Sequence, residues 1–197
     1  MSYKLIGISG KKNSGKNTLL RFLKDEIHFR FKQRVTDIAF ADPIKKAAMI
    51  MFPSIDSADL FGDSNRRSKV VEGHINPETG EPLTIRDVLL QIGKWGRQTN
   101  PNTWIDAVLP DIRDNILTSN VVVADCRFAN EKAIIESFPF NGIVVRLIRT
   151  NVENTASDES ETTFDGGEHV FYRTIINDTI DSLAKQANEL VTDLFSK

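Results

Sequence analysis

A glycine-rich segment near the N-terminus constrains the fold of this chain more than any other feature. Residues 10–18 read GKKNSGKNT and match the pattern G-x-x-x-x-G-K. They lie between an apolar stretch at 3–9 and a segment at 18–31 whose apolar residues recur at helical spacing. Several backbone N–H groups converge on a phosphate only in a tight turn at a helix N-terminus, and glycine permits that turn. We therefore predict a strand, a phosphate-binding loop and a helix, in that order.

The loop residues divide into a cradle for phosphates and a metal position. Gly10 and Gly15 permit the turn, and Lys16 brings a positive charge to the transferring phosphate. Asn17 stands where Ser or Thr normally binds Mg²⁺, and we expect its amide oxygen to serve the metal or a metal-bound water. The predicted ATP-binding residues of the loop are Gly10, Asn13, Ser14, Gly15, Lys16, Asn17 and Thr18. The alternative is a strand–helix turn that binds no ligand.

Apolar runs and helical patterns alternate along the rest of the chain. This alternation is typical of βαβ units, and we predict an α/β fold with three layers, α/β/α, around a parallel sheet in one domain over residues 1–197. The continuous β-branched run at 121–124 is the clearest central strand. We expect strands at 3–9, 35–40, 121–124 and 143–148, and helices at 18–31, 43–51 and 180–195.

Two polar segments interrupt this alternation. The segment at about 53–82 contains glycines, prolines and charge clusters, and the segment at about 150–168 is acidic and rich in Ser and Thr. Long insertions inside a compact domain are usually functional. We predict that the first lies near an acceptor site and that the second forms a lid. The alternative for each segment is a plain surface loop.

The composition excludes several classes of function. The formal net charge of −2 argues against a general nucleic-acid-binding protein, which normally carries a basic excess. A single cysteine, Cys126, excludes an internal disulfide and fits a reducing compartment. The apolar run at the N-terminus is too short for a signal peptide or a spanning helix, so we expect a cytoplasmic protein with no membrane partner. The sequence leaves the oligomeric state open, although a homodimer is the commonest assembly of soluble proteins.

A second polar cluster follows the predicted strand at 121–124. Ligands of open parallel sheets bind at the carboxyl ends of the strands, so Asp125 is expected at the same edge as the phosphate loop. Asp125 offers a carboxylate to Mg²⁺ or to a substrate hydroxyl, and Arg127 offers a planar fork to a phosphate. Glu131 follows about one helical turn later and is expected to fix Arg127. The alternative is a helix N-cap with a surface ion pair.

The segment at 84–108 is a candidate acceptor pocket. A base-binding pocket needs an amide for the base edge, an apolar or aromatic wall, and cations for the phosphate. Gln91 and Trp104 supply the first two parts, and Arg86 or Arg97 supplies the third. The alternative is an amphipathic helix pair with a buried Trp104 and solvated arginines, and the pattern supports it at least as well.

In their order along the chain, these motifs resemble those of the bacteriophage deoxynucleoside monophosphate kinases, a branch of the P-loop NMP kinase-like proteins. GKKNSGK is similar to their G-x-x-x-S-G-K, FADPIKKA at 40–47 to F-A-x-P-I-K, and LLQIGKWGR to L-x-Q-x-x-G. ADCRFANE is similar to D-x-R-x-x-x-E, the pair at 160–161 to an S-E pair, and IINDTIDSL at 175–183 to N-D-x-[ST]-x-x-x-L. The likeness runs over nearly the whole chain.

The resemblance implies a P-loop NTPase fold with an NMP-binding insertion and a lid, ATP with Mg²⁺ as donor, and a deoxynucleoside monophosphate as acceptor. It also implies a viral protein in the host cytoplasm, with Asn177 near the adenine. The residues that it assigns to the acceptor site are Arg86, Gln91, Gly93, Trp104, Asp125, Arg127 and Glu131, and we predict that Lys45 and Arg97 also bind the substrate. Two positions depart from the family pattern: Asn17 stands where an acidic residue is frequent, and alignment on Gly93 shifts Gln91 by one position.

The expected chemistry is phosphoryl transfer, which depends on positioning and charge neutralisation. Lys16, Asp125 and Arg127 are the predicted catalytic residues. Lys16 holds the β- and γ-phosphates, Asp125 helps to seat Mg²⁺, and Arg127 holds the acceptor phosphate with Arg86 or Arg97. Further candidates for contacts with the ATP phosphates are Arg146, Arg149 and Arg173.

Three other interpretations compete with this one. A small-metabolite kinase of the dephospho-coenzyme A or phosphomevalonate kinase type has the same loop and differs in its acceptor pocket. A GTPase-like switch is disfavoured, because the D-x-x-G at 59–62 follows no apolar strand and no N-K-x-D occurs. A catalytically inactive homologue finds its best support in Asn17.

Overall fold

The computed structural model describes residues 3–150, 163–165 and 169–196. The chain divides into two compact units, of which unit 1 comprises Met1–Ala39 and Pro110–Lys197, and unit 2 comprises Phe40–Leu109. The one domain expected from the sequence thus contains two units. Unit 2 begins before and ends after the polar insertion expected at about 53–82.

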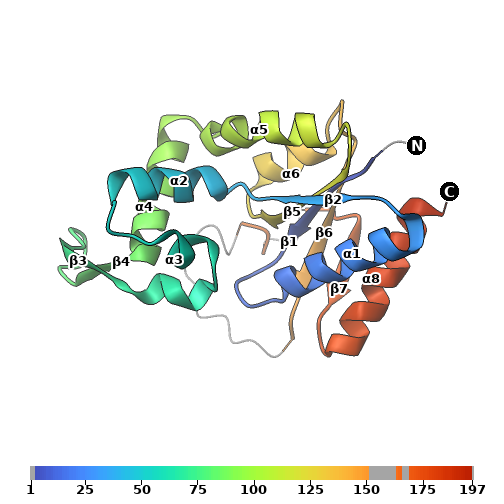
Figure 1. Cartoon of the computed structure of the whole chain (residues 1–197), viewed down its shortest axis with the longest axis horizontal. Coiled ribbons are helices and arrows are strands. Elements are labelled where there is room, and N and C mark those ends of the chain that lie inside the picture. The colour runs from blue at the N-terminus through green and yellow to red at the C-terminus, as the bar shows by residue number, and fades with distance from the viewer. Residues whose placement is uncertain (1–2, 151–162, 166–168, 197) are drawn as a thin grey trace. The chain divides into compact units, whose positions relative to one another are not determined.

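Unit 1 is built on a five-stranded sheet in which every neighbouring pair of strands is parallel (Figure 1). The strand order is β2-β5-β1-β6-β7, and β1 lies in the centre because it pairs with both β5 and β6. The four predicted strands are confirmed, and β7 was not predicted. The strands are β1 (Leu5–Ser9), β2 (Val35–Ile38), β5 (Asn120–Cys126), β6 (Ile143–Ile148) and β7 (Arg173–Ile176).

Helices cover both faces of this sheet, which confirms the predicted three-layer α/β/α arrangement for unit 1. Side chains alternate between the faces of a strand, so Ile6 and Ile8 of β1 point to the same side. They join a core with α1 (Lys16–Phe31) and α8 (Ile180–Phe195). Gly7 faces the other side, where a Cβ would lie 2.8 Å from Ile135 of α6 (Ala129–Glu136).

Unit 2 has its own apolar core, although much of its sequence is polar. Its elements are α2 (Asp42–Met51), α3 (Ser57–Phe61), the short 3₁₀ helix η1 (Ser64–Ser68), β3 (Val70–Ile75), β4 (Pro82–Thr84), α4 (Ile85–Thr99) and the start of α5 (Thr103–Asn115), which continues into unit 1. β3 and β4 form an antiparallel hairpin. The core contains Ala48, Ile55, Leu60, Val71, Leu83, Ile85, Val88, Ile92 and Trp104. The first polar segment is therefore folded and is not a plain surface loop.

The start of α4 follows from its first residues. Thr84 is the N-cap and accepts a hydrogen bond from the backbone N–H of Asp87, whose carboxylate accepts one from the backbone N–H of Thr84 in return. This reciprocal pair is a capping box, which satisfies helix N–H groups that have no partner within the helix. The core face of α4 ends at Gly96, directly against Trp104 of α5.

Most of the predicted lid at about 150–168 lies outside the described residues. Thr150 and residues 163–165 are described. Residues 163–165 belong to unit 1 and contact the phosphate-loop region, as detailed below. Among the described residues, no helix combines the length and the apolar character needed to cross a lipid bilayer.

We expect Gly96→Ala to destabilise the protein by about 1–3 kcal/mol, because the added Cβ would overlap the Trp104 indole in a packed core. Alanine has the higher helix propensity, so a loss of stability isolates the steric effect. Chemical denaturation measures the change, with Lys94→Ala on the exposed part of α4 as control. A Gly96→Ala protein as stable as the control contradicts the packing described here.

Candidate active site

The phosphate-binding loop predicted from the sequence connects β1 to α1. β1 ends at Ser9, and α1 begins at Lys16. Asn13 and Gly15 have φ values of 61° and 99°, in the left-handed region that favours glycine. Gly10 is required for a different reason: a Cβ there would lie 2.7 Å from the Leu147 carbonyl oxygen and 2.7 Å from Ser14 Oγ. The turn is therefore specified by backbone conformation at one end and by close approach at the other.

Two polar side chains of the loop differ in how their hydrogen bonds are satisfied. The ammonium of Lys16 donates to the carbonyl oxygens of Gly10 and, at 2.7 Å, of Lys11. Ser14 is 3% exposed, and its Oγ has no hydrogen-bond partner among the described residues. A buried hydroxyl without a partner costs about 1–3 kcal/mol, which a ligand oxygen bonded to it would recover. A flexible cation and an unsatisfied hydroxyl fit the phosphates of a nucleotide.

The metal position predicted at Asn17 lies in the first turn of α1, where its side chain is exposed and Thr18 follows half-buried. Mg²⁺ takes only one or two oxygen ligands from a protein and completes its shell with water and phosphate oxygens. The amide oxygen of Asn17 and the carboxylate of Asp125 have that chemistry. Within the described residues, no group of three or more His, Cys, Asp or Glu side chains forms a metal cluster.

Asp125 and Arg127 lie at the same edge of the sheet as the loop. β1 and β5 run parallel, and Ser9 at the end of β1 pairs with Cys126 at the end of β5. The side chains of Asp125 and Arg127 are half-buried. The Asp125 carboxylate, on the penultimate residue of β5, and the Arg127 guanidinium, directly after β5, thus lie at the carboxyl end of the strand beside the phosphate loop, as ligand groups of open parallel sheets do.

Glu131 holds the backbone next to Arg127. Its Oε2 accepts hydrogen bonds from the backbone N–H of Arg127 at 2.6 Å and of Phe128 at 3.0 Å. The side chain is 7% exposed and caps the start of α6. This placement favours a positioning role over direct contact with an acceptor.

The surroundings of Glu131 shift its protonation equilibrium. Burial, and then the negative charge of Asp125, raise the pKa of Glu131 to about 7, while the two backbone hydrogen bonds and the Arg127 charge oppose the shift. Burial also raises the pKa of the Cys126 thiol, and the charges of Glu131 and Asp125 add to the effect. Cys126 is therefore a packed, protonated thiol at the end of β5.

Two side chains from the ends of β6 and β7 contact the loop. Arg149 donates from Nη1 to the carbonyl oxygen of Asn13 at 3.3 Å, and Asn177 donates from Nδ2 to that of Ser14 at 2.8 Å. The structure thus gathers all predicted ATP-binding residues in unit 1. Arg173, another predicted candidate, instead pairs with Asp193 of α8.

Lys11 and Asp165 belong to this region and were missed by the sequence analysis. The Asp165 carboxylate accepts from Lys11 Nζ at 2.6 Å and from Arg146 Nη2 at 3.3 Å. Arg146 also donates to Ser9 Oγ at 3.0 Å, and its guanidinium lies 5.5 Å from the centre of the Phe164 ring. The Asp165 carboxylate thus forms ion pairs with the side chains of Lys11 and Arg146, beside the phosphate loop. No periodic pattern around Asp165 marks this contact in the sequence.

The predicted acceptor cations of unit 2 lie mainly on α4. Arg86, Gly93 and Arg97 are spaced by seven and four residues and therefore share one helix face. Arg86 donates to the Ser64 carbonyl oxygen at 3.4 Å, and the Arg97 guanidinium packs over Gly93. Lys45 of α2 pairs with Asp42 at 2.7 Å.

Gln91 and Trp104 do not join that face. Gln91 precedes Gly93 by two residues, about 200° around the helix, and its amide is 3.5 Å from Asn76 Oδ1. Trp104 is 8% exposed and donates from Nε1 to the Gly93 carbonyl oxygen at 3.0 Å. The structure therefore does not bring Gln91 and Trp104 onto the face of α4 that carries the two arginines. The arrangement matches the helix-pair alternative for Trp104.

The D-x-x-G sequence at 59–62 has a structural role. Asp59 is buried and pairs with Arg66 at 2.6 Å and with Lys69 at 2.8 Å. Hydrogen bonds from Lys69 and Arg66 keep the pKa of Asp59 below its usual value. The carboxylate thus links α3 to η1 and to the start of β3.

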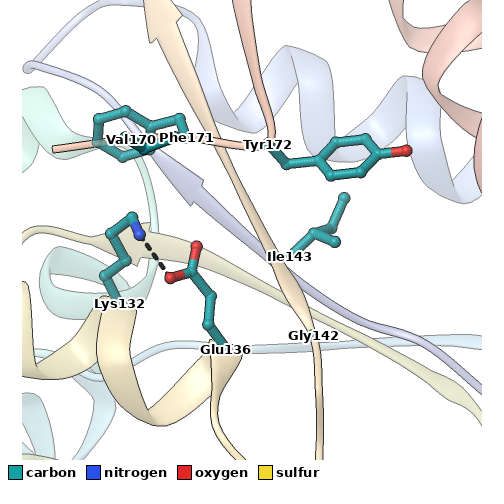
Figure 2. Close-up of a pocket in the computed structure, with 7 residues that line it drawn as sticks. All are labelled: Lys132, Glu136, Gly142, Ile143, Val170, Phe171 and Tyr172. Carbon is teal, nitrogen blue, oxygen red and sulfur yellow. Dashed lines mark hydrogen bonds and ion pairs between the residues drawn. The ribbon is translucent and has the colours of Figure 1, made fainter.

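A pocket of about 360 Å³ lies at the opposite edge of the sheet, at the amino ends of β6 and β7 (Figure 2). Lys132 and Glu136 of α6 form an ion pair at 2.5 Å in its wall. The pocket is lined by Lys132, Glu136, Gly142, Ile143, Val170, Phe171 and Tyr172. Because the phosphate loop follows the carboxyl end of β1, this pocket is separate from it.

Comparison with known proteins finds a viral relative and distant structural neighbours, among them a sugar kinase. The chain is 25% identical over 173 residues, covering 80% of each chain, to an Acanthamoeba polyphaga mimivirus protein named "Putative deoxynucleotide monophosphate kinase". An unliganded sugar kinase from Janibacter sp. HTCC2649 aligns with 98% of this chain and 95% of its own, at 12% identity and a TM-score of 0.41. No protein-family model matches the sequence.

We expect the stability of the nucleotide-free and metal-free protein to fall as pH rises from about 4.5 to 7. The pKa of Glu131 is raised in the folded state, so across this range the folded protein keeps a proton that the unfolded chain loses. The loss is of the order of 3 kcal/mol, because each pKa unit corresponds to about 1.4 kcal/mol. Both backbone hydrogen bonds end on one oxygen, which the amide of Glu131→Gln retains. Denaturation across this pH range should show a smaller fall for the variant, and parallel curves contradict the assignment.

We expect Asp165→Asn to bind tripolyphosphate about two- to fivefold more tightly than wild type, because Lys11 and Arg146 lose a competing carboxylate. Isothermal titration calorimetry at low salt measures the affinity. Asp193→Asn is the matched control, since it also removes the acid of a surface ion pair, on the far part of α8. Equal or weaker binding by Asp165→Asn contradicts the competition.

Proposed function

We propose that this protein is an ATP-dependent deoxynucleoside monophosphate kinase, which transfers the γ-phosphoryl group of ATP to a deoxynucleoside monophosphate and releases ADP and the diphosphate. The similarity to the mimivirus protein over 80% of both chains carries the proposal. Such a match includes part of each unit, because neither unit alone makes up 80% of the chain. It therefore supports a shared chemistry beyond a shared phosphate loop.

On the donor side, the loop backbone and Lys16 bind the phosphates of ATP. Lys16 exchanges its bonds to the Gly10 and Lys11 carbonyl oxygens for phosphate oxygens, where its charge stabilises the transferring group. Asp125 and Asn17 supply oxygen ligands to Mg²⁺. The metal, when bound, neutralises negative charge on the phosphates.

On the acceptor side, Arg127 binds the phosphate of the nucleoside monophosphate, because a planar guanidinium matches two phosphate oxygens. Arg86 and Arg97, on one face of α4, are further candidate ligands for that phosphate. Lys45 adds positive charge. Glu131 acts through the backbone of Arg127, and Trp104 acts by holding α4 against α5. These two buried residues are positioning residues in this proposal.

A panel of acceptors separates this function from its competitors. ADP formation from ATP and Mg²⁺ is followed with each of four deoxynucleoside monophosphates, each of four ribonucleoside monophosphates, dephospho-coenzyme A and phosphorylated alcohols. Turnover that requires a deoxynucleotide supports the proposal. Turnover with a coenzyme precursor or phosphorylated alcohol alone identifies a different small-metabolite kinase, and no turnover with any acceptor favours an inactive homologue.

We expect Lys16→Ala to lower kcat by about 10²–10³ with the best acceptor, since removal of one preorganised group that stabilises transition-state charge has this effect in other enzymes. Lys24→Ala is the matched control, because Lys24 lies further along α1 in an exposed ion pair with Asp37. Thermal melts establish that both variants fold. Unchanged turnover in folded Lys16→Ala excludes the proposed role of the loop.

A further inference from the structure

The phosphate loop is fixed from outside by a side chain that follows the last strand. Asn177 comes directly after β7, and its backbone N–H donates to the Ile148 carbonyl oxygen of β6 at 2.8 Å. Its side-chain Nδ2 donates to the Ser14 carbonyl oxygen at 2.8 Å. A carbonyl oxygen only accepts hydrogen bonds, so the contacting atom of the amide is its nitrogen. The sheet therefore determines where this amide group stands.

This contact determines the orientation of one peptide unit. The Ser14 carbonyl and the Gly15 N–H belong to the same planar trans peptide and point in opposite directions. With the carbonyl held by Asn177, the Gly15 N–H is turned to the other side of the loop. The left-handed φ values of Asn13 and Gly15 belong to the type of turn in which N–H groups converge on an anion.

The loop sequence alone does not specify that orientation. Glycine adopts positive and negative φ about equally well, so the Ser14–Gly15 peptide is free to rotate unless an outside contact holds it. The amide of Asn177 packs directly on Gly15, where a Cβ would overlap Nδ2. Gly15 thus leaves room for the side chain that fixes its own peptide.

We propose that Asn177 is a positioning residue that presents the Gly15 N–H to the phosphates of the bound nucleotide. The identity of the anion rests on the proposed function. The hydrogen bond from Asn177 to Ser14 and the orientation of the Gly15 N–H do not depend on it. The role is separate from the adenine contact expected from the sequence, because it uses one N–H of the amide on the loop itself. Arg149 makes a longer contact to Asn13, at 3.3 Å, which leaves Asn177 as the closer of the two contacts.

Two variants test this role with inorganic tripolyphosphate as the probe. Asn177→Ala removes the donor without adding charge, and Asn177→Asp keeps the shape of the side chain but replaces the donor with an acceptor. Affinity is measured by calorimetry, and the amide resonance of Gly15 is followed by ¹⁵N-edited NMR. Asn188→Ala and Asn188→Asp are the matched controls, because the Asn188 amide bonds to Glu26 elsewhere in unit 1.

We expect Asn177→Ala to bind tripolyphosphate about tenfold more weakly than wild type and to lose the anion-induced shift of the Gly15 resonance. If Asn177→Ala does not fold, Asn177→Asp is compared with Asn188→Asp, which carries the same added charge. Binding within twofold of the matched control, with the Gly15 shift retained, overturns the proposal.

Failure of the proposed function is a separate outcome, because the probe requires no acceptor. A wild-type protein that binds tripolyphosphate but phosphorylates no deoxynucleotide leaves the role of Asn177 standing. A wild-type protein that does not bind tripolyphosphate overturns both.

Discussion

The central position of β1 determines where the groups of the candidate site stand. β1 pairs in parallel with β5 on one side and with β6 on the other, and β6 pairs in parallel with β7. Parallel strands bring their carboxyl ends to one edge. The phosphate loop, Arg149 and Asn177 follow β1, β6 and β7 respectively, and Asp125 is the penultimate residue of β5. These groups therefore gather although up to 167 residues separate them in the sequence, between Gly10 and Asn177. Strand order thus determines where the groups of the candidate site lie, and the residues at the strand ends determine its chemistry.

Most charged groups of the candidate site bond to one another or to the loop backbone. Lys16 donates to loop carbonyl oxygens, Asp165 accepts from two cations, and Ser14 Oγ has no hydrogen-bond partner among the described residues. Phosphate binding therefore exchanges internal contacts for contacts to the ligand, and the affinity is a difference between them. Each internal contact is a place where a single substitution changes affinity without changing the fold.

Local patterns in the sequence predicted the loop and four of the five strands of unit 1, because hydrophobic periodicity and glycine spacing reflect local conformation. They also predicted which edge of the sheet carries Asp125. They did not predict the partners of the polar groups: the buried Glu131 bonds to backbone N–H groups, and the exposed Asp165 pairs with Lys11 at a separation of 154 residues. Side-chain type likewise did not determine the helix face of Gln91, since one residue of register turns a side chain about 100° around a helix.

The most direct test of the account is to identify the products by ³¹P NMR. Purified protein, ATP, Mg²⁺ and one deoxynucleoside monophosphate are mixed, and the resonances of ADP, the deoxynucleoside diphosphate and orthophosphate are followed together. The account predicts that the diphosphate and ADP appear in equal amounts with little orthophosphate, because the phosphate loop and the arginines transfer the group to a bound acceptor. ATP that is converted to ADP and orthophosphate while the deoxynucleotide resonance stays unchanged would contradict it.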